Sequence, residues 1–264
     1  MNHNDILGVT MAGLEAGFKV LHIATFDLSV CAPDSDVREV LNDPSKKDFD
    51  HLPVKEKGRI TGVVERDSKS TLGTVRQNMR SLDDSILVSA EEPLPKFLPT
   101  LKDSSYRLVV NGPEIRGIVT LSDVAKLPVR LLAFTLVTHL EVILADTIRK
   151  ERSIDAEWLS LLHPKQRKTV EGRLKKRKKE NLHLFPLEVT DLSHKITVVA
   201  KLRGTTDFER QLEPIVKLRN SLDHASDFVE VCGGLNGFLE RLGLVEHWID
   251  ALKLDDSRQN NINA

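Results

Sequence analysis

Short runs of apolar and β-branched residues alternate with turn residues through the first half of the chain. The runs have the length and composition of β-strands. They cover residues 51–54, 59–64, 107–110 and 115–120. Lys57-Gly58 separates the first two runs and Asn111-Gly112 the last two, and such glycine-containing pairs favour tight turns. The pattern therefore predicts two β-hairpins.

The two predicted hairpins belong to a longer internal repeat. Leu28 to Arg66 and Ile86 to Leu121 share one order of features, in which a strand, a helix, a strand, a turn and a strand follow one another. Gly62 matches Gly117 at an offset of 55 residues. Because a repeated period decides the architecture of a chain, we expect two copies of one β/α unit.

A helical pattern replaces the alternating one at Leu127-Pro128 and continues almost to the end of the chain. Proline suits the first turn of a helix. Apolar residues then recur every three or four positions between Leu132 and Ile148. This spacing predicts one long helix that ends at about Arg152.

Further helices follow from the same periodicity, with Gly233-Gly234 as a break before the last of them. They are predicted at residues 155–162, 164–181, 187–202, 207–228 and 235–252. We therefore expect an α+β protein with three parts. These are a repeat domain at 1–126 with its core at 21–126, an all-α bundle at 127–254, and a polar, disordered tail at 255–264.

Composition fits a folded two-domain chain and excludes some classes of protein. Of 264 residues, 40% are hydrophobic and 29% are charged, and the formal net charge is −1. Cys31 and Cys232 have no metal or redox spacing, and the histidines have no metal-ligand spacing. The N-terminus lacks a secretory pattern, and the apolar region Leu131 to Leu144 is shorter than a membrane span. We expect a cytoplasmic protein with no membrane or metal partner.

The segment Gly117 to Asp123, GIVTLSD, places Thr120 three residues before Asp123 at a predicted strand-to-helix junction. A hydroxyl and a carboxylate there can hydrogen-bond two ribose hydroxyls, while amides at the helix start favour a nearby phosphate. The alternative is that both side chains only cap the helix.

Two such units in tandem, the second closing in Gly-Ile-Val-Thr-x-x-Asp, resemble a CBS-domain pair of β-α-β-β-α repeats. The resemblance implies clefts between the repeats that bind adenosine-containing ligands, here a regulatory adenine nucleotide. In the first unit Thr120 becomes Glu65 and Asp123 becomes Ser68 at the same offset, so that cleft lacks the ribose grip. We expect one nucleotide site, at Thr120 and Asp123.

The candidate catalytic residues lie in EPIVKLRNSLDHASDF, where Arg219 and Asn220 precede His224. Histidine can exchange a proton near neutral pH with a ribose 2′-hydroxyl or a 5′-oxygen. Guanidinium can bind the phosphate and stabilise its developing charge. Residues five apart on a helix do not share a face, and the alternative for Arg219 is an intrahelical ion pair with Asp223.

Arg-Asn-x-x-x-His late in an all-helical domain resembles the HEPN family, over about residues 128–252. The resemblance implies a homodimer whose motif helices meet at one shared cleft, and metal-independent cleavage of RNA. It also implies a role in stress or anti-phage defence, with an antitoxin as a possible partner. Asn220 fills the polar position of the motif. Asp223, Glu141 and His139 are secondary candidates for the same cleft.

Residues 165–179 carry nine basic side chains and one acidic one. Such a helix can neutralise RNA phosphates, or it can be a solvated surface. The RNA-binding candidates are Lys175, Lys176, Arg177, Lys178 and Lys179.

The sequence thus predicts a nucleotide-regulated, metal-independent endoribonuclease. Its rival is a non-catalytic sensor or adaptor, in which nucleotide occupancy controls binding to a partner protein or RNA. Transfer of a nucleotide group ranks last, because no acidic pair that would bind a metal and nucleotide is found.

Overall fold

The computed structural model describes residues 13–67, 72–182, 184–204, 207–223 and 228–262, the last eight of these as backbone only. The chain divides into two compact units, at residues 12–132 and 133–264. The boundary falls inside the long helix, six residues after the boundary at 126/127 that the sequence predicts.

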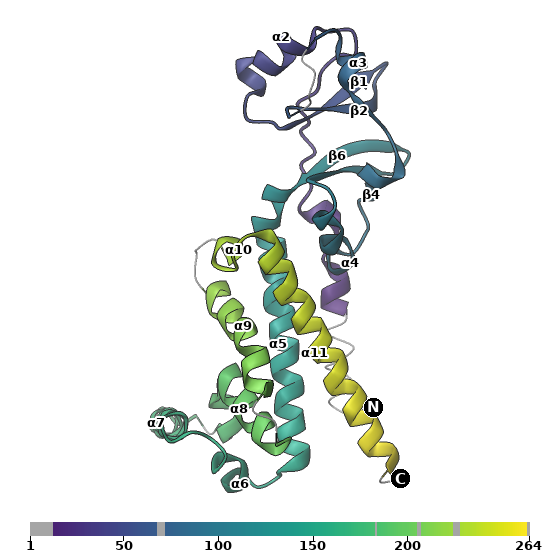
Figure 1. The fold of residues 1–264 in the computed structure, drawn as a ribbon. Coiled ribbons are helices and arrows are strands. Elements are labelled where there is room, and N and C mark those ends of the chain that lie inside the picture. The colour runs from purple at the N-terminus through teal and green to yellow at the C-terminus, as the bar shows by residue number, and fades with distance from the viewer. Residues whose placement is uncertain (1–12, 68–71, 183, 205–206, 224–227, 263–264) are drawn as a thin grey trace. The chain divides into compact units, whose positions relative to one another are not determined.

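Two β-hairpins form the frame of the N-terminal unit (Figure 1). Strands β1 (His51–Glu56) and β2 (Arg59–Glu65) make the first, and β5 (Tyr106–Asn111) and β6 (Glu114–Thr120) make the second. Six antiparallel residue pairs build each ladder, and every pair of the second lies 55 positions after its counterpart in the first. The register shifts after Val54 and after Val109, again 55 apart. The structure therefore confirms the predicted repeat, and the two copies also share the position of a β-bulge.

Each hairpin gains a third strand. Strand β3 (Arg80–Ser81) gives the first sheet the order β1-β2-β3, and β4 (Leu87–Ser89) pairs in parallel with β5 in the order β4-β5-β6. The short α-helix α2 (Val37–Asn42) precedes β1, while α3 (Val75–Asn78) connects β2 to β3 and α4 (Leu94–Phe97) lies between β4 and β5. The 3-10 turns of this unit are η1 (Val20–His22), η2 (Pro44–Lys46), η3 (Asp84–Ile86), η4 (Leu98–Lys102) and η5 (Leu121–Ala125).

Gly62 and Gly117, the equivalent glycines of the two repeats, have the same structural role. A Cβ on Gly62 would lie 2.6 Å from the carbonyl oxygen of Arg80 in β3. A Cβ on Gly117 would lie 3.1 Å from the carbonyl oxygen of Thr25. Each glycine thus lets a further backbone segment approach its hairpin, which a side chain would obstruct.

The second predicted turn is displaced by one residue. Strand β5 includes Asn111, so the turn consists of Gly112 and Pro113 rather than Asn111-Gly112. The first turn is at Lys57-Gly58 as predicted, with positive φ angles of 48° and 85°. Gly112 also has a positive φ, of 64°, which glycine adopts without strain.

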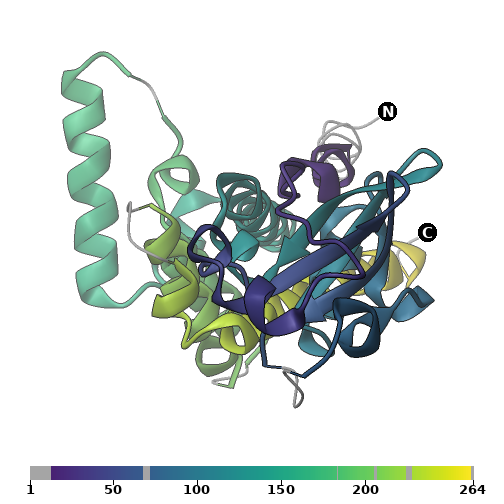
Figure 2. The same ribbon diagram turned by 90° about the horizontal axis from the view of Figure 1, so that it is seen from above.

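The described residues of the C-terminal unit are helical (Figures 1 and 2). The long helix α5 (Leu127–Glu151) matches its prediction. The other elements are α6 (Asp155–Leu159), α7 (Pro164–Lys179), η6 (Pro186–Val189), α8 (Leu192–Leu202), α9 (Asp207–Leu222), α10 (Phe228–Val231) and α11 (Leu235–Ile262). In both views α7 stands out from the other helices of its unit.

Several predicted helix boundaries differ from the structure. Helix α6 ends at Leu159 rather than Leu162, α7 at Lys179 rather than Asn181, and α9 at Leu222 rather than Phe228. The helix expected at 187–202 is divided, because Asp191 adopts an extended conformation and its backbone N–H is bonded to the His194 ring, which starts α8 afresh. Helix α11 continues to Ile262, whereas the sequence predicts a disordered tail from residue 255. No proline or glycine occurs at 253–262, so a polar composition alone does not end the helix.

Helix α5 is apolar over a longer stretch than the region Leu131 to Leu144 that the sequence analysis compared with a membrane span. By length and composition it could cross a membrane, and 61% of its most apolar window is buried within the protein. The core helix of a soluble protein meets the same criteria, so this is weak evidence for a membrane span. The argument that the apolar region is too short does not hold for the 25-residue helix.

Candidate functional site

A linker at residues 25–31, which leads into the first repeat, lines two clefts of the N-terminal unit. Its start is held by Thr25, whose backbone exchanges hydrogen bonds of 2.8 and 3.0 Å with Ile118. Its end is held by Cys31, whose carbonyl accepts a hydrogen bond of 2.9 Å from the Lys55 backbone. Asp27 and Ser29 line one cleft, and Phe26 and Val30 the other.

The first cleft has a volume of about 340 Å³. It contains both residues of the predicted ribose grip, together with the linker, the start of β1 and the loop before β1. Its lining residues are Thr25, Asp27, Leu28, Ser29, Asp48, Phe49, Asp50, His51, Pro53, Ser105, Ile118, Thr120, Leu121, Ser122 and Asp123.

Thr120 and Asp123 meet at the strand-to-helix junction. One carboxylate oxygen of Asp123 accepts hydrogen bonds from the Thr120 backbone at 2.6 Å and from the Thr120 hydroxyl at 3.0 Å. The other carboxylate oxygen lies 2.6 Å from the ammonium of Lys126. The Asp123 side chain is only 7% exposed. The side chains form a capping box for η5, as the alternative predicts, and they also line the cleft, while their contact with a ribose stays a prediction.

Arg66 holds the loop that closes one side of this cleft. Its guanidinium donates to the carbonyls of Leu41 at 2.6 Å, Lys46 at 2.7 Å and Phe49 at 3.2 Å. Its backbone N–H donates to Asp50 at 2.8 Å. The planar fork of arginine satisfies several acceptors at once, so one side chain fixes Phe49 and Asp50 at the cleft.

His51 and Tyr106, equivalent positions of the two repeats, stack with their ring centroids 4.3 Å apart. Burial lowers the pKa of His51, against the opposing effect of Glu65 and other carboxylates. The Tyr106 hydroxyl donates to Glu65 at 3.0 Å, and burial together with Glu65 raises its pKa. Glu65, which replaces Thr120 in the first repeat, is thus engaged with Tyr106. Ser68 lies outside the described residues.

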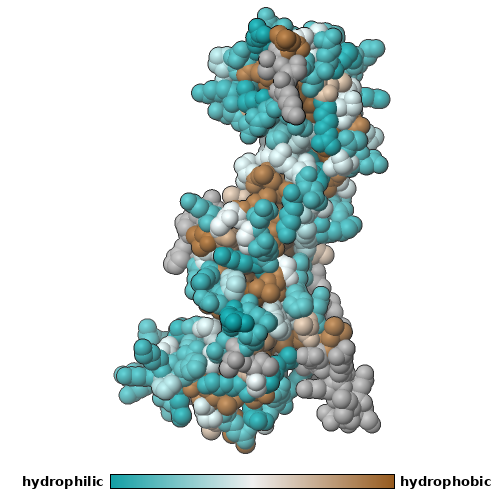
Figure 3. Space-filling model, viewed as in Figure 1, coloured by the Kyte–Doolittle hydropathy of each residue, from teal (hydrophilic) through white to brown (hydrophobic). Residues whose placement is uncertain are grey.

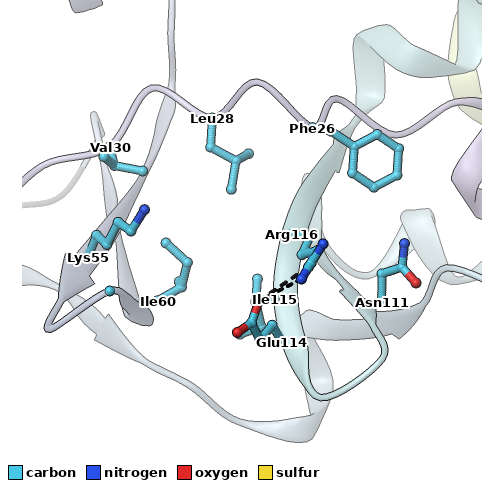
Figure 4. A pocket seen from close by; sticks show the side chains of 10 residues that line it. Phe26, Leu28, Val30, Lys55, Ile60, Asn111, Glu114, Ile115 and Arg116 are labelled. Carbon is cyan, nitrogen blue, oxygen red and sulfur yellow. Dashed lines mark hydrogen bonds and ion pairs between the residues drawn. The ribbon is translucent and has the colours of Figure 1, made fainter.

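The second cleft, of about 600 Å³, lies beside the turns of the hairpins (Figure 4). Phe26, Leu28 and Val30 of the linker line it, with Arg116 bonded to Glu114 at 3.0 Å on the opposite side. The sequence analysis did not predict this cleft. The alternation of Thr-Phe-Asp-Leu-Ser-Val at 25–30 is a signal that could have indicated a segment with two differently lined sides, although the structure forms no strand there.

A third cleft, of about 470 Å³, belongs to the helical unit. Helices α5, α7 and α9 and the segment before α8 contribute to it. Its lining residues are Glu141, Arg173, Lys176, Arg177, Leu184, Glu188, Val189, Thr190, Asp191 and Arg219. The structure thus brings together one predicted catalytic arginine, one secondary candidate and two predicted RNA-binding cations.

The floor of the helical cleft carries paired charges. Arg173 binds both carboxylate oxygens of Asp191, at 2.7 and 2.9 Å. Burial would raise the pKa of Asp191, but the Arg173 guanidinium outweighs it and the pKa is lowered. Lys195, whose side chain is 7% exposed, donates to Glu141 at 2.7 Å and to the Thr190 carbonyl at 2.8 Å.

The predicted catalytic pair is only half described. Arg219 forms an intrahelical ion pair with Asp223, which is the alternative to a catalytic role that the sequence analysis gave. The Arg219 side chain is 35% exposed and lines the cleft. Asn220 is exposed on α9. His224 lies outside the described residues, so its distance from Arg219 stays a prediction. His139 is 3% exposed in the helical core rather than at the cleft.

The basic helix α7 is largely a solvated surface. Lys175, Lys178 and Lys179 are exposed, and Val170 is its buried contact with the unit. Lys176 and Arg177 line the cleft as well. The lower-left surface in Figure 3, where α7 lies in Figure 1, is strongly hydrophilic.

Metal-ligating side chains do not gather in the part of the chain that the structure describes. No three His, Cys, Asp or Glu residues come together there. Cys31 and Cys232 are both buried free thiols, and burial raises the pKa of Cys31 to about 11 and also raises that of Cys232.

A comparison with protein-family models finds a match, which covers the second repeat. The family model for the CBS domain matches residues 77–130, which include β4, β5, β6 and the junction with Thr120 and Asp123. Residues 77–130 form a CBS domain. A comparison with curated proteins finds no match.

Several solved CBS structures are similar to the chain. A conserved CBS domain protein of unknown function from Thermoplasma acidophilum is 20% identical, with 40% of this chain and 67% of that chain covered and a TM-score of 0.36. CBSX2 in complex with AMP is 21% identical, with 44% and 98% covered and a TM-score of 0.38. The CBS domain of a bacterial CNNM/CorC family Mg²⁺ transporter in complex with ATP is 18% identical, with 47% and 94% covered and a TM-score of 0.36.

Proposed function

We propose that the cleft at Thr120 and Asp123 binds an adenosine-containing ligand and that the N-terminal unit is a nucleotide sensor. The observation that carries this proposal is the nearly buried carboxylate of Asp123, set beside the Thr120 hydroxyl within the cleft of a CBS domain. A carboxylate offers about four acceptor positions, and three are used here. One ribose hydroxyl takes the fourth, and a second takes the position of Lys126 when its ammonium, on a 40% exposed side chain, turns to solvent.

Calorimetric titration of the full chain with adenosine, AMP, ADP and ATP tests this site. Asp123→Asn should weaken binding by about tenfold or more, since a hydrogen bond to a charged group contributes about 1.5–3 kcal/mol. Asp83→Asn is the matched control, because Asp83 also caps a 3-10 turn and pairs with an arginine but lies outside the cleft. Equal binding by wild type and Asp123→Asn would refute the site.

For the helical unit we propose metal-independent cleavage of RNA by Arg219 and His224, at a cleft shared by two copies of the chain. The observation in its favour is that Lys176 and Arg177 of α7 and Arg219 of α9 line one cleft. In the proposed step, His224 accepts the proton of a 2′-hydroxyl, whose oxygen attacks the phosphorus. The P–O5′ bond breaks, and the departing oxygen takes a proton. Arg219 holds the phosphate oxygens. The products are a 2′,3′-cyclic phosphate and a 5′-hydroxyl.

Incubation with cellular RNA in chelator, with and without adenine nucleotides, tests the cleavage. His224→Ala and Arg219→Ala should each abolish it in folded protein. Arg210→Ala is the control, because Arg210 is an exposed arginine of the same helix that pairs with Asp207. Unchanged cleavage in both motif variants would refute this enzyme. Absence of cleavage under every condition would favour the adaptor, whose nucleotide occupancy controls a partner.

Regulation requires that the ligand bind two arrangements of the protein with different affinity, because equal affinity shifts nothing. We propose that α5, whose residues belong to both units, carries this bias to the helical unit. Nucleotide dependence of the cleavage rate is the corresponding measurement.

A further inference from the structure

The charged groups around the Thr120 cleft have one predominant sign. Four aspartates, Asp27, Asp48, Asp50 and Asp123, line it, and no lysine or arginine occurs among the described residues of its lining. The first three are exposed at its rim. His51 adds no compensating charge near neutral pH, because burial lowers its pKa.

Two cations that contact the residues of this cleft, Lys126 and Arg66, have partners of their own. Lys126 lies 2.6 Å from Asp123 and also donates to the carbonyl of Ile23 at 2.6 Å. Arg66 directs its guanidinium to backbone carbonyls of the loop, as described above. Together they offset two of the four carboxylates, so the rim keeps an excess of negative charge.

The remaining lining suits the uncharged parts of a nucleoside. Asp123 and Thr120 offer acceptors for ribose hydroxyls. Phe49 is 41% exposed at the cleft and offers an aromatic face for a base. Leu28 and Ile118 add apolar contact.

From this arrangement we propose that the cleft selects an adenosine-type nucleoside whose 5′ substituent is uncharged or cationic, and discriminates against 5′-phosphates. The inference rests on the proposed nucleoside site and names its ligand class. At about 7 Å in water, one pair of like unit charges lowers affinity roughly threefold. A phosphate dianion facing two rim aspartates should therefore bind about fivefold or more weakly than the nucleoside after screening by salt.

Titration calorimetry with adenosine, S-adenosylmethionine and AMP tests the proposal. Wild type should bind adenosine and S-adenosylmethionine about fivefold or more tightly than AMP. Raising the salt from about 50 to 300 mM should strengthen AMP binding, because it screens repulsion, whereas a basic phosphate site would lose affinity. Asp27→Asn combined with Asp50→Asn should raise the affinity for AMP, and raise it more than that for adenosine. Asp34→Asn, whose side chain is 84% exposed outside the cleft, should change neither.

The outcomes separate the two proposals. Tighter binding of AMP or of magnesium-bound ATP than of adenosine, or an AMP affinity that the double variant does not raise, overturns the charge selection and leaves the nucleoside site intact. Absence of binding by all probes, or adenosine binding that Asp123→Asn does not weaken, overturns the site itself and the selection with it.

Discussion

Removal of the Arg66 guanidinium should open the loop that closes the nucleoside cleft. Arg66→Met keeps most of the side-chain length but loses three hydrogen bonds to the carbonyls of Leu41, Lys46 and Phe49. Water can reach these partly exposed groups, so we take about 1 kcal/mol for each bond and about 3 kcal/mol in total. An opening equilibrium that is easier by this amount corresponds to a factor of about 150.

Native-state hydrogen exchange followed by mass spectrometry measures this opening directly. The amides of Lys46 and Phe49 are bonded within the loop, at 2.9 and 3.1 Å, and should exchange about a hundredfold faster in Arg66→Met. Arg66→Lys should recover at most about a third of the loss, because one ammonium cannot reach three carbonyls. Arg76→Met, which removes an arginine 44% exposed, should leave this loop unchanged. Acceleration below about threefold in folded Arg66→Met would refute the reasoning.

Three further predictions concern stability. Gly62→Ala should destabilise the N-terminal unit by about 2 kcal/mol or more in thermal unfolding, because its Cβ would meet a backbone carbonyl at 2.6 Å. The control Gly172→Ala, on α7 with open space around it, should stabilise the protein by up to about 1 kcal/mol. Equal effects of the two substitutions would contradict this prediction. Burial lowers the pKa of His51, so its contribution to stability is complete above about pH 6.5 and is lost as the pH falls toward its pKa in the folded protein. Wild type should therefore lose more stability than His51→Gln between about pH 7 and 5. Parallel stability profiles of the two proteins would contradict this prediction. Lys195→Met should cost about 3 kcal/mol because it leaves Glu141 unpaired, and adding Glu141→Gln should recover part of the loss; a loss below about 1 kcal/mol would exclude this pair as a stabilising contact.

The hairpin repeat could be predicted from the sequence because its signals are local. Turn residues and alternation fix each hairpin, and the offset of 55 between Gly62 and Gly117 extends to every ladder pair. Helix α5 was predicted for the same reason, since its apolar spacing is regular. The C-terminal end of α11 could not be predicted from the sequence. A polar segment without glycine or proline can either continue a helix or follow it as an irregular tail.

The candidate sites were harder to predict, because they are made by contacts between distant segments. Thr120 and Asp123 lie in one motif and were found, whereas Phe49 and Asp50 come to the same cleft from a distant loop that Arg66 holds. The meeting of Arg219 with α7 likewise depends on how the helices of that unit pack. Periodicity gives the face of a helix but not its neighbour.

The linker between the two clefts also constrains how the chain can change in length. It is held at Thr25 and at Cys31, and only residues 26–30 lie between these points. An inserted or deleted residue there would shift Phe26 and Asp27 relative to the two held ends and so change which cleft each of them lines. Insertions should therefore be tolerated in the loops around the sheets but be selected against in this segment, and its length should stay constant among chains that keep both clefts.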